Sequence, residues 1–448
     1  MFRRLAPSGS LFEVSLPAGR RLLSGELARV DVLLDDPGLL ALFAPFFDLW
    51  EGRPSIPMES YLRMMLLKFR FGLGYRRLCG LVDDTFSWRR FCRIGLEARV
   101  PDESTIRKIT RRCGPALVDA LNGRLLDTAV ERGVVDLARV RADTTVVEAD
   151  IRYPTDSGLL CYVVCRIAKL CGRLADSGMK VSCVDRSGLA KSAQHSIGVS
   201  LRRRSGDAKA EVLKITADLA DLAGLAVADA EAVLKRTAKT PCQKRALAQL
   251  AMLCPHATKV IAQARKRVAG VQPDGATRLV SLHDRDARPI RKGRIGKPVE
   301  FGFLAQVVDN ADGIVLDYQV LIGNPHDAEL LQPAIERIIG RCHQPPGLVT
   351  ADRGYWLPGI EADLAALDVA SVAIPRTGKP SQARAAIEHS ETFTTAIKWR
   401  TGCEGRISHL KRDCGWRRSR LRGHDGARIW CGHGVFCHNL LKLANHQT

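Results

Sequence analysis

The sequence lacks the patterns that mark several common protein classes. None of its 14 cysteines forms a CxxC pair, which argues against a zinc ribbon or a thioredoxin-like motif. The first residues, MFRRLAPSGSLFEV, contain no continuous apolar run, so no secretory signal is expected. The most apolar stretch, Leu159 to Cys171, is interrupted by Arg166 and Lys169, and it is too short and too charged to span a membrane. We therefore expect reduced thiols in the cytoplasm.

Internal repeats and low-complexity segments are also absent, so an ordinary globular protein is expected. The 448 residues are 46% hydrophobic, which is enough to build the cores of two or three domains. Charged residues make up 26% of the chain, a value that argues against bulk disorder.

Positive charge is abundant instead. The formal net charge is +20, and the sequence pI is about 9.6. An excess of this size favours a polyanionic partner, and nucleic acid is the commonest one. Mutational drift toward arginine in a genome rich in G and C would raise the charge as well, so composition alone supports nucleic acid binding only in part.

Short helices are predicted between residues 55 and 135. Pro57 stands early in a first turn, and an apolar stripe follows at helical spacing. The stripe consists of Leu62, Met65, Leu66 and Phe69. A later helix opens at residues 101–104, and its outer face includes the cations Arg107, Lys108 and Arg111. A helical DNA-binding domain would present such a face, but so would a helical bundle whose cations are merely solvated.

The pattern becomes extended and β-branched at residues 139–147. Residues 157 to about 275 then contain almost no strand signal, which predicts a helical insertion. A turn at residues 309–313 and helices at 327–340 and 391–412 are expected. The remaining predicted strands are Arg278–His283, Val299–Val308, Ile314–Ile322, Gly347–Ala351 and Val369–Ile374.

With the insertion removed, this order predicts the α/β class, as a mixed sheet flanked by helices. By analogy of fold, the order matches a ribonuclease H-like domain. The predicted organisation is a loosely organised segment over 1–54, a helical DNA-binding domain over 55–135, a ribonuclease H-like catalytic domain over 136–156 and 276–448, and a helical insertion over 157–275.

Three acids stand out as candidate metal ligands. Asp143 lies in an otherwise apolar, β-branched strand, where a charge is costly unless it is paired or metal-bound. A solvated Asp on an edge strand is an equally good interpretation, and Glu148 and Asp150 lie close enough to compete for the role. Asp352 ends an apolar strand, and ligands of α/β sheets gather at the carboxyl ends of strands. Because strand-ending Asp residues also cap turns, that alternative remains.

Glu404 is the third acid. In a continuous helix it shares one face with Arg400 and Lys411, an arrangement that suits a metal ion next to DNA phosphates. Ordinary surface pairing between residues one turn apart explains the same spacing, and by itself it is the simpler interpretation.

Four residues with metal-binding side chains crowd together near the end of the chain. They are Cys431, His433, Cys437 and His438. Glycines interrupt them, and the apolar residues around them predict a packed terminal helix. Incidental thiols and core histidines are therefore favoured over a zinc site.

In combination, the acid segments resemble the DDE transposases of bacterial insertion sequences. The resemblance is carried by Arg141–Thr145, by Thr350–Tyr355 and by the stretch from Glu404 to Arg412. Supporting segments are similar to the family's middle strands and N-terminal domain, so the resemblance covers nearly the whole chain from residue 55. These segments are Lys297–Gly302, Gly323–Asp327, Ser55–Phe91 and Pro101–Ile109.

The third block of the family reads Tyr, two residues, Arg, three residues, Glu, six residues, Lys. Arg400, Glu404 and Lys411 fit this spacing, whereas Ile397 stands at the Tyr position. The departure puts in doubt any handling of DNA ends that an aromatic residue would serve, and it leaves the acids untouched.

The resemblance implies that Asp143 and Asp352 share one metal ion and that Glu404 completes a second site. The expected ion is Mg²⁺, for which Mn²⁺ can substitute. Water would attack a phosphodiester at the element end, and the released 3′-OH would then attack target DNA. The expected DNA-binding residues are Arg400, Lys411, Arg406, Arg107, Lys108 and Arg111.

The expected partners are the DNA of the element ends and of the target, and a homodimer or larger assembly once two ends are synapsed. No membrane and no small-molecule substrate are expected, and the expected location is the cytoplasm, in association with the bacterial nucleoid. Basic clusters in the insertion favour an arm on DNA or on a second subunit, although each alone would suit a surface. The clusters lie at residues 202–204, 235–236, 244–245 and 265–267.

Two other functions compete with transposition. One is a DNA-binding regulator or inactive remnant, in which only the helical N-terminus works; the complete set of acids argues against it. The other is a ribonuclease H-like nuclease that cleaves without strand transfer, which shares the first chemical step.

Overall fold

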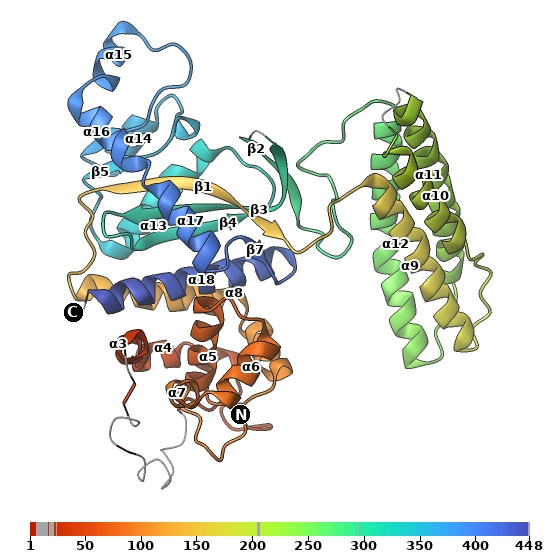
Figure 1. Cartoon of the computed structure of the whole chain (residues 1–448), viewed down its shortest axis with the longest axis horizontal. Coiled ribbons are helices and arrows are strands. Elements are labelled where there is room, and N and C mark those ends of the chain that lie inside the picture. The colour runs from red at the N-terminus through yellow and green to blue at the C-terminus, as the bar shows by residue number, and fades with distance from the viewer. Residues whose placement is uncertain (6–16, 18–21, 24, 204–206, 295, 447–448) are drawn as a thin grey trace. The chain divides into compact units, whose positions relative to one another are not determined.

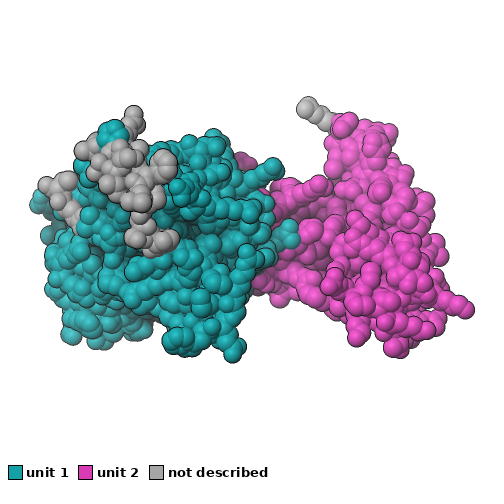
Figure 2. Space-filling model, turned by 90° about the horizontal axis from the view of Figure 1, so that it is seen from below, with its two compact units in different colours: residues 1–149, 303–448 teal, residues 150–302 magenta. Residues whose placement is uncertain are grey.

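The computed structural model describes residues 1–5, 17, 22–23, 25–203, 207–294 and 296–446 (Figure 1). Most of the segment used to exclude a secretory signal therefore lies outside the described residues. The chain divides into two compact units, residues 1–149 with 303–448, and residues 150–302 (Figure 2). Each unit has a hydrophobic core of its own.

The first unit begins with helices. They are α3 (Gly25–Leu34), α4 (Pro37–Ala41), η1 (Ala44–Phe46), α5 (Met58–Arg70), α6 (Tyr75–Asp84), α7 (Phe86–Phe91) and α8 (Glu103–Glu131). Residues 25–46, part of the segment expected to be loosely organised, are thus helical. Arg63 of α5 is fully buried and pairs with Asp31 and Asp35, which ties the first of these helices to α5.

Helix α8 contains a sharp break. Gly114 has φ 63° and ψ −165°, a conformation that side-chain-bearing residues rarely adopt, and Pro115 follows it. The part before the break carries the basic face predicted from the sequence, and the part after it packs against the terminal helix α18 (Gly423–Asn445). Helices α8 and α18 run side by side along the sheet in Figure 1.

A mixed sheet forms the centre of the chain, and the predicted α/β class is confirmed. Its order is β2-β3-β1-β5-β6, with β4 paired to β3 and β7 paired to β1. Strands β5 and β6 run parallel to β1, whereas β4 runs antiparallel to β3. The bounds are β1 (Val140–Ala149), β2 (Arg288–Arg294), β3 (Lys297–Asn310), β4 (Val315–Leu321), β5 (Leu348–Thr350), β6 (Ser371–Ala373) and β7 (Arg418–Ser419).

The predicted hairpin turn at residues 309–313 is confirmed, because Gly313 adopts φ 79° and Asn310 bonds to Ile314. The strand predicted at 278–283 is wrong. The side-chain amide of Gln263 accepts from the backbone N–H of Leu279 and donates to its C=O, so a side chain satisfies groups that a strand partner would bind. The strand instead forms at Arg288–Arg294 and pairs with residues 297–302 of β3.

Helices follow the strands in the second half of the first unit. They are η2 (Asp327–Leu330), α13 (Leu331–Cys342), η3 (Arg353–Tyr355), α14 (Ile360–Ala365), α15 (Gln382–Glu388), α16 (Glu391–Arg400) and α17 (Cys403–Asp413). Helix α18 and helix α13 pack on β4, and α17 packs on β1. The predicted packed terminal helix is confirmed, since most of α18 is buried.

The continuous helix predicted over 391–412 is wrong, because it divides between α16 and α17. The N–H of Gly402 bonds to the C=O of Trp399 at 3.1 Å, three residues back, instead of four. Arg141 donates to the same carbonyl at 2.9 Å, and a Cβ at residue 402 would lie 2.5 Å from the Arg141 Nη1. The tightened turn thus fits around a buried arginine of β1.

In the described part of the second unit, helices pack around a common core. They are α9 (Asp156–Asp176), α10 (Ser187–Ser200), α11 (Asp207–Leu234) and α12 (Pro241–Val268). Thr240 caps α12 through a capping box with Gln243. Of the predicted basic clusters, Arg202, Arg203, Lys235 and Arg236 are exposed, and Arg204 lies outside the described residues.

Candidate active site

Asp143 and Asp352 come together because their strands are neighbours. Strand β1 pairs with β5 in parallel, with Arg141 opposite Thr350. Each aspartate follows its member of that pair by two residues, so Asp143, within β1, lies level with Asp352 and on the same side of the sheet. Asp352 stands just past the carboxyl end of β5, the kind of place at which ligands of α/β sheets gather.

A backbone N–H group donates a hydrogen bond to each of the two aspartates. Asp143 Oδ1 accepts from its neighbouring backbone N–H of Thr144 at 2.7 Å. Asp352 ends β5, caps η3, and accepts from the N–H of Gly354 at 2.8 Å. The Asp143 side chain is 13% exposed and that of Asp352 is 39% exposed, so the pair is open to solvent from the Asp352 side.

Arg400, at the end of α16, joins the two acids. Its Nη2 lies 2.9 Å from Asp143 Oδ2 and 3.5 Å from Asp352 Oδ2. One cationic nitrogen therefore reaches both carboxylates. The Nε of the same guanidinium is buried and has no hydrogen-bond partner.

Asp327 is a third acid near Asp143 and Asp352, and no role was predicted for it from the sequence. Its Oδ2 accepts from the Thr144 hydroxyl at 3.0 Å. Burial raises the pKa of Tyr355 well above its usual value, and the negative charges of Asp327, Asp143 and Asp352 raise it further. All three aspartates thus lie near enough to act electrostatically on one buried phenol. The signal was present, because Asp327 ends the Gly323–Asp327 segment quoted for the family resemblance.

The competitors of Asp143 lie elsewhere. Glu148 is paired with Arg418 of β7 at 2.8 Å, toward the far end of β1. Asp150 follows the end of that strand and is exposed. Asp143 is the acid of β1 that adjoins Asp352.

Glu404 lies in the first turn of α17 and is exposed. Among the contacts of these described residues, none joins Glu404 to Asp143 or Asp352. The start of α17, the helix that carries Glu404, is held in place by buried contacts. Asp309, fully buried, accepts from Arg141 at 2.8 Å and from Arg406 of α17 at 3.1 Å, and the Cys403 thiol lies 3.9 Å from it.

The predicted DNA-binding residues differ in their surroundings. Arg107, Lys108 and Arg111 are exposed on the first part of α8, where Arg107 also pairs with Glu103. Lys411 is half-buried on α17, and the paired Arg406 side chain is only 14% exposed. Ile397, at the family's Tyr position, packs beside Phe393 and Ala396.

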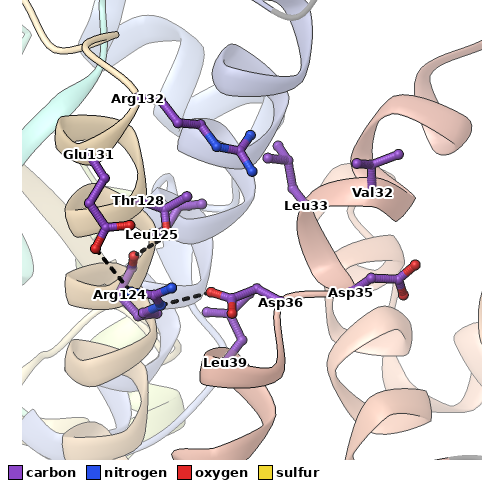
Figure 3. A pocket seen from close by; sticks show the side chains of 10 residues that line it. All are labelled: Val32, Leu33, Asp35, Asp36, Leu39, Arg124, Leu125, Thr128, Glu131 and Arg132. Atoms are coloured by element: carbon purple, nitrogen blue, oxygen red, sulfur yellow. Dashed lines mark hydrogen bonds and ion pairs between the residues drawn. The ribbon is translucent and has the colours of Figure 1, made fainter.

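We call the group of Asp143, Asp327 and Asp352 the acid edge. The acid edge fits a divalent metal ion. Carboxylate oxygens are the ligands that Mg²⁺ and Mn²⁺ prefer, and a cationic nitrogen already lies between two of them. An open pocket of about 320 Å³ lies elsewhere, between α3, α4 and α8 (Figure 3). Its Arg124 is paired with Asp36 and Glu131, so its central charges satisfy one another.

Comparison with known families gives the site its context. Residues 17–112 match the family described as Transposase domain (DUF772), and residues 280–440 match the family described as Transposase DDE domain. Neither the curated proteins nor the solved structures compared with the chain gave a match. No helix in the described part of the chain is both long and apolar enough to cross a membrane.

The first match covers the N-terminal helices, and the second covers β2 to β7 and most of α18, including Asp327, Asp352 and Glu404. Strand β1, which carries Asp143, lies outside both matches. A DDE domain has a ribonuclease H-like fold, acts on DNA and uses divalent metal ions, in agreement with the mixed sheet and its acid edge. The chain belongs to the insertion-sequence DDE transposase family and is a transposase.

Proposed function

We propose that this transposase cuts the ends of an insertion sequence and joins the released 3′ ends to target DNA, using Mg²⁺ held by Asp143, Asp352 and Glu404. The observation that supports it most is the shared guanidinium of Arg400, since two acids from adjacent strands converge on one cation. Mn²⁺, with the same preference for oxygen ligands, is expected to substitute.

In this proposal the sheet supplies the rigid part of the site. Asp143, within β1, and Asp352, just after β5, would hold one ion, and Glu404 would bind from α17. The metal would neutralise charge on the attacking and leaving oxygens of an in-line displacement. With the carboxylates on the metal, Arg400 would be available to bind a DNA phosphate.

The proposed DNA surface has two parts. The exposed cations Arg107, Lys108 and Arg111 of α8 contact the backbone of the element end, and Lys411 contacts it near the acids. The ion pair of Arg406 with buried Asp309 supports a different role for that residue, namely positioning α17. Two ends must be brought together, so the working form is a homodimer or a larger assembly, with the basic clusters of the second unit on DNA or on the other subunit.

The test is cleavage and joining of labelled DNA that carries the element end. Asp352→Asn and Glu404→Gln are expected to fall below about one hundredth of the wild-type rate, because weakening even an outer partner of a metal ligand costs 10–100-fold. Matched controls are Asp363→Asn and Glu391→Gln, which alter exposed acids of α14 and α16.

Full activity of Asp352→Asn would overturn the site. Cleavage by the wild-type chain without joining would overturn strand transfer and favour a nuclease. Equal loss in a matched control would show that the assay reports surface charge and not the acid edge.

A further inference from the structure

A second group of metal-binding side chains lies away from the acid edge, where α17 ends against α18. His409 is in the last part of α17, Cys414 follows that helix directly, and His438 belongs to α18. One potential ligand atom from each lies within 4.8 Å of the other two. None of these residues has a role in the proposed reaction.

The spacing suits one tetrahedral ion. Zn²⁺ binds sulfur at about 2.3 Å and imidazole nitrogen at about 2.0–2.1 Å, which places sulfur and nitrogen ligands roughly 3.6 Å apart. The Cys414 Sγ lies 3.8 Å from the His409 Nε2. A simple hydrogen bond would account for this pair alone, but it would not bring the His438 ring to the same point.

Both imidazoles are also held in the tautomer that a metal site needs. The Nε2 of His438 lies 2.8 Å from the C=O of Gly313 and must carry the proton, because a carbonyl can only accept. Its Nδ1 therefore has the free lone pair. The Nδ1 of His409 lies 2.8 Å from Asp413, which leaves Nε2 for the metal. Metal-binding histidines commonly donate their other N–H to a carboxylate or a carbonyl in this way.

The ligand atoms that meet here belong to His409, Cys414 and His438. Cys414 supplies the sulfur of the group and is buried, as is the neighbouring Cys437.

Two other residues of α18, His433 and Cys431, are buried outside this group of ligands. His433 stacks on the Phe69 ring with centroids 5.4 Å apart, and burial lowers its pKa. Burial alone raises the pKa of the Cys431 thiol. For these two residues the sequence-based interpretation of core histidine and incidental thiol fits, whereas the His438 ring lies against His409 of α17, with ring centroids 5.0 Å apart.

We propose that His409, Cys414 and His438 bind one Zn²⁺ ion that fixes the end of α17 on α18. Sulfur and nitrogen ligands select zinc, in contrast to the oxygen ligands of the acid edge. Because α17 carries Glu404 in its first turn, the ion would also limit how far that acid can move.

The direct test is the zinc content of the full chain after a brief wash with EDTA, followed by Co²⁺ substitution. About one zinc per chain is expected, and Co²⁺ should give the charge-transfer absorption of a thiolate complex. Cys414→Ser and His409→Asn are expected to lose at least nine tenths of the zinc. His409 is partly exposed, so that variant tests the site with the least disturbance of the core.

The matched control is Cys431→Ser, which removes an equally buried thiol from α18, and Asp352→Asn controls for the acid edge. Both should keep the zinc, which separates this proposal from the fate of the proposed catalytic site. A zinc-free wild-type chain, a Cys414–Cys437 disulfide in the purified protein, or equal loss of zinc in Cys431→Ser would overturn the site.

Discussion

The charge of the single residue Arg400 compensates two carboxylates of the acid edge. Its Nη2 compensates Asp143 and Asp352 together, so two like charges can lie close without a metal. Asp327 has a different partner, the hydroxyl of Thr144, which leaves it beside the pair and not within it. The aspartates at this edge are therefore not equivalent.

That difference predicts a graded response to substitution. Asp327→Asn removes the charge and retains an acceptor for Thr144, so we expect cleavage to fall about tenfold, the effect of roughly one hydrogen bond to a charged group. Dependence on metal concentration should persist. A loss as deep as that of Asp352→Asn, measured in the same cleavage assay, would instead make Asp327 a principal metal ligand.

Lys68 provides a pH-dependent test at the residue scale. Its ammonium lies 3.9 Å from the centroid of the Trp430 ring, and burial, with a smaller effect of Arg420, lowers its pKa to about 7. The unfolded chain keeps this lysine protonated up to its ordinary pKa of about 10.4. Between these values the unfolded state binds more protons, so raising the pH favours the folded state.

We therefore expect Lys68→Met to be most stabilising, relative to wild type, at pH 7 and below. The advantage should shrink steadily toward pH 10, as measured by urea unfolding at several pH values. A difference between the two proteins that does not change with pH would show that Lys68 titrates normally.

At the scale of elements, a buried ion network holds α17 to the sheet. Asp309 of β3 is fully buried and accepts from Arg141 of β1 and from Arg406 of α17. Arg141 also reaches the C=O of Trp399 at the end of α16. The position of Glu404 depends on this network, because it sets the turn that separates the two helices.

Asp309→Asn would leave two arginines without their carboxylate. Breaking a buried pair in this way costs about 3–5 kcal/mol, so we expect the free energy of unfolding to fall by that amount. Denaturant titration measures it, with Asp312→Asn in the adjacent turn as the control. A change below about 1 kcal/mol would mean that solvent or rearrangement compensates the arginines.

These elements also show what could be read from the sequence. Asp352 could be predicted from the sequence, because the end of an apolar strand and the motif Thr350–Tyr355 both point to this residue. The absence of a strand at 278–283 could not be predicted. Nothing in the local sequence reveals that the Gln263 side chain hydrogen-bonds to the backbone N–H and C=O of Leu279. Likewise, the break at Gly402 depends on Arg141, which is distant in sequence. Asp327 was missed because it was interpreted only as the start of a helix, and its contact with Thr144, distant in sequence, is not visible locally.

At the scale of the whole molecule, the net charge of +20 favours a polyanionic partner. The exposed cations of α8 form one basic face, and those of the second unit form others. Salt dependence of binding distinguishes phosphate contacts from solvated charge, because each contact contributes about 0.9 to the slope of log affinity against log salt concentration.

We expect the triple change of Arg107, Lys108 and Arg111 to Gln to lower that slope by about 2–3 for duplex DNA carrying the element end. The same number of changes at Lys235, Arg236 and Lys244 tests the helical unit separately, by fluorescence anisotropy over a range of salt. An unchanged slope in the α8 variant would remove this face from the proposed DNA surface.

The central claim is that Asp352 binds the metal ion used in DNA cleavage. Replacing its oxygen by sulfur tests this directly, because thiolate ligands bind Mg²⁺ poorly and bind softer ions well. Cleavage by Asp352→Cys is therefore expected to be lost in Mg²⁺ and to return in Mn²⁺ or Cd²⁺, relative to the wild-type chain in the same ions. Equal activity of the variant in Mg²⁺ and in the softer ions would contradict the account.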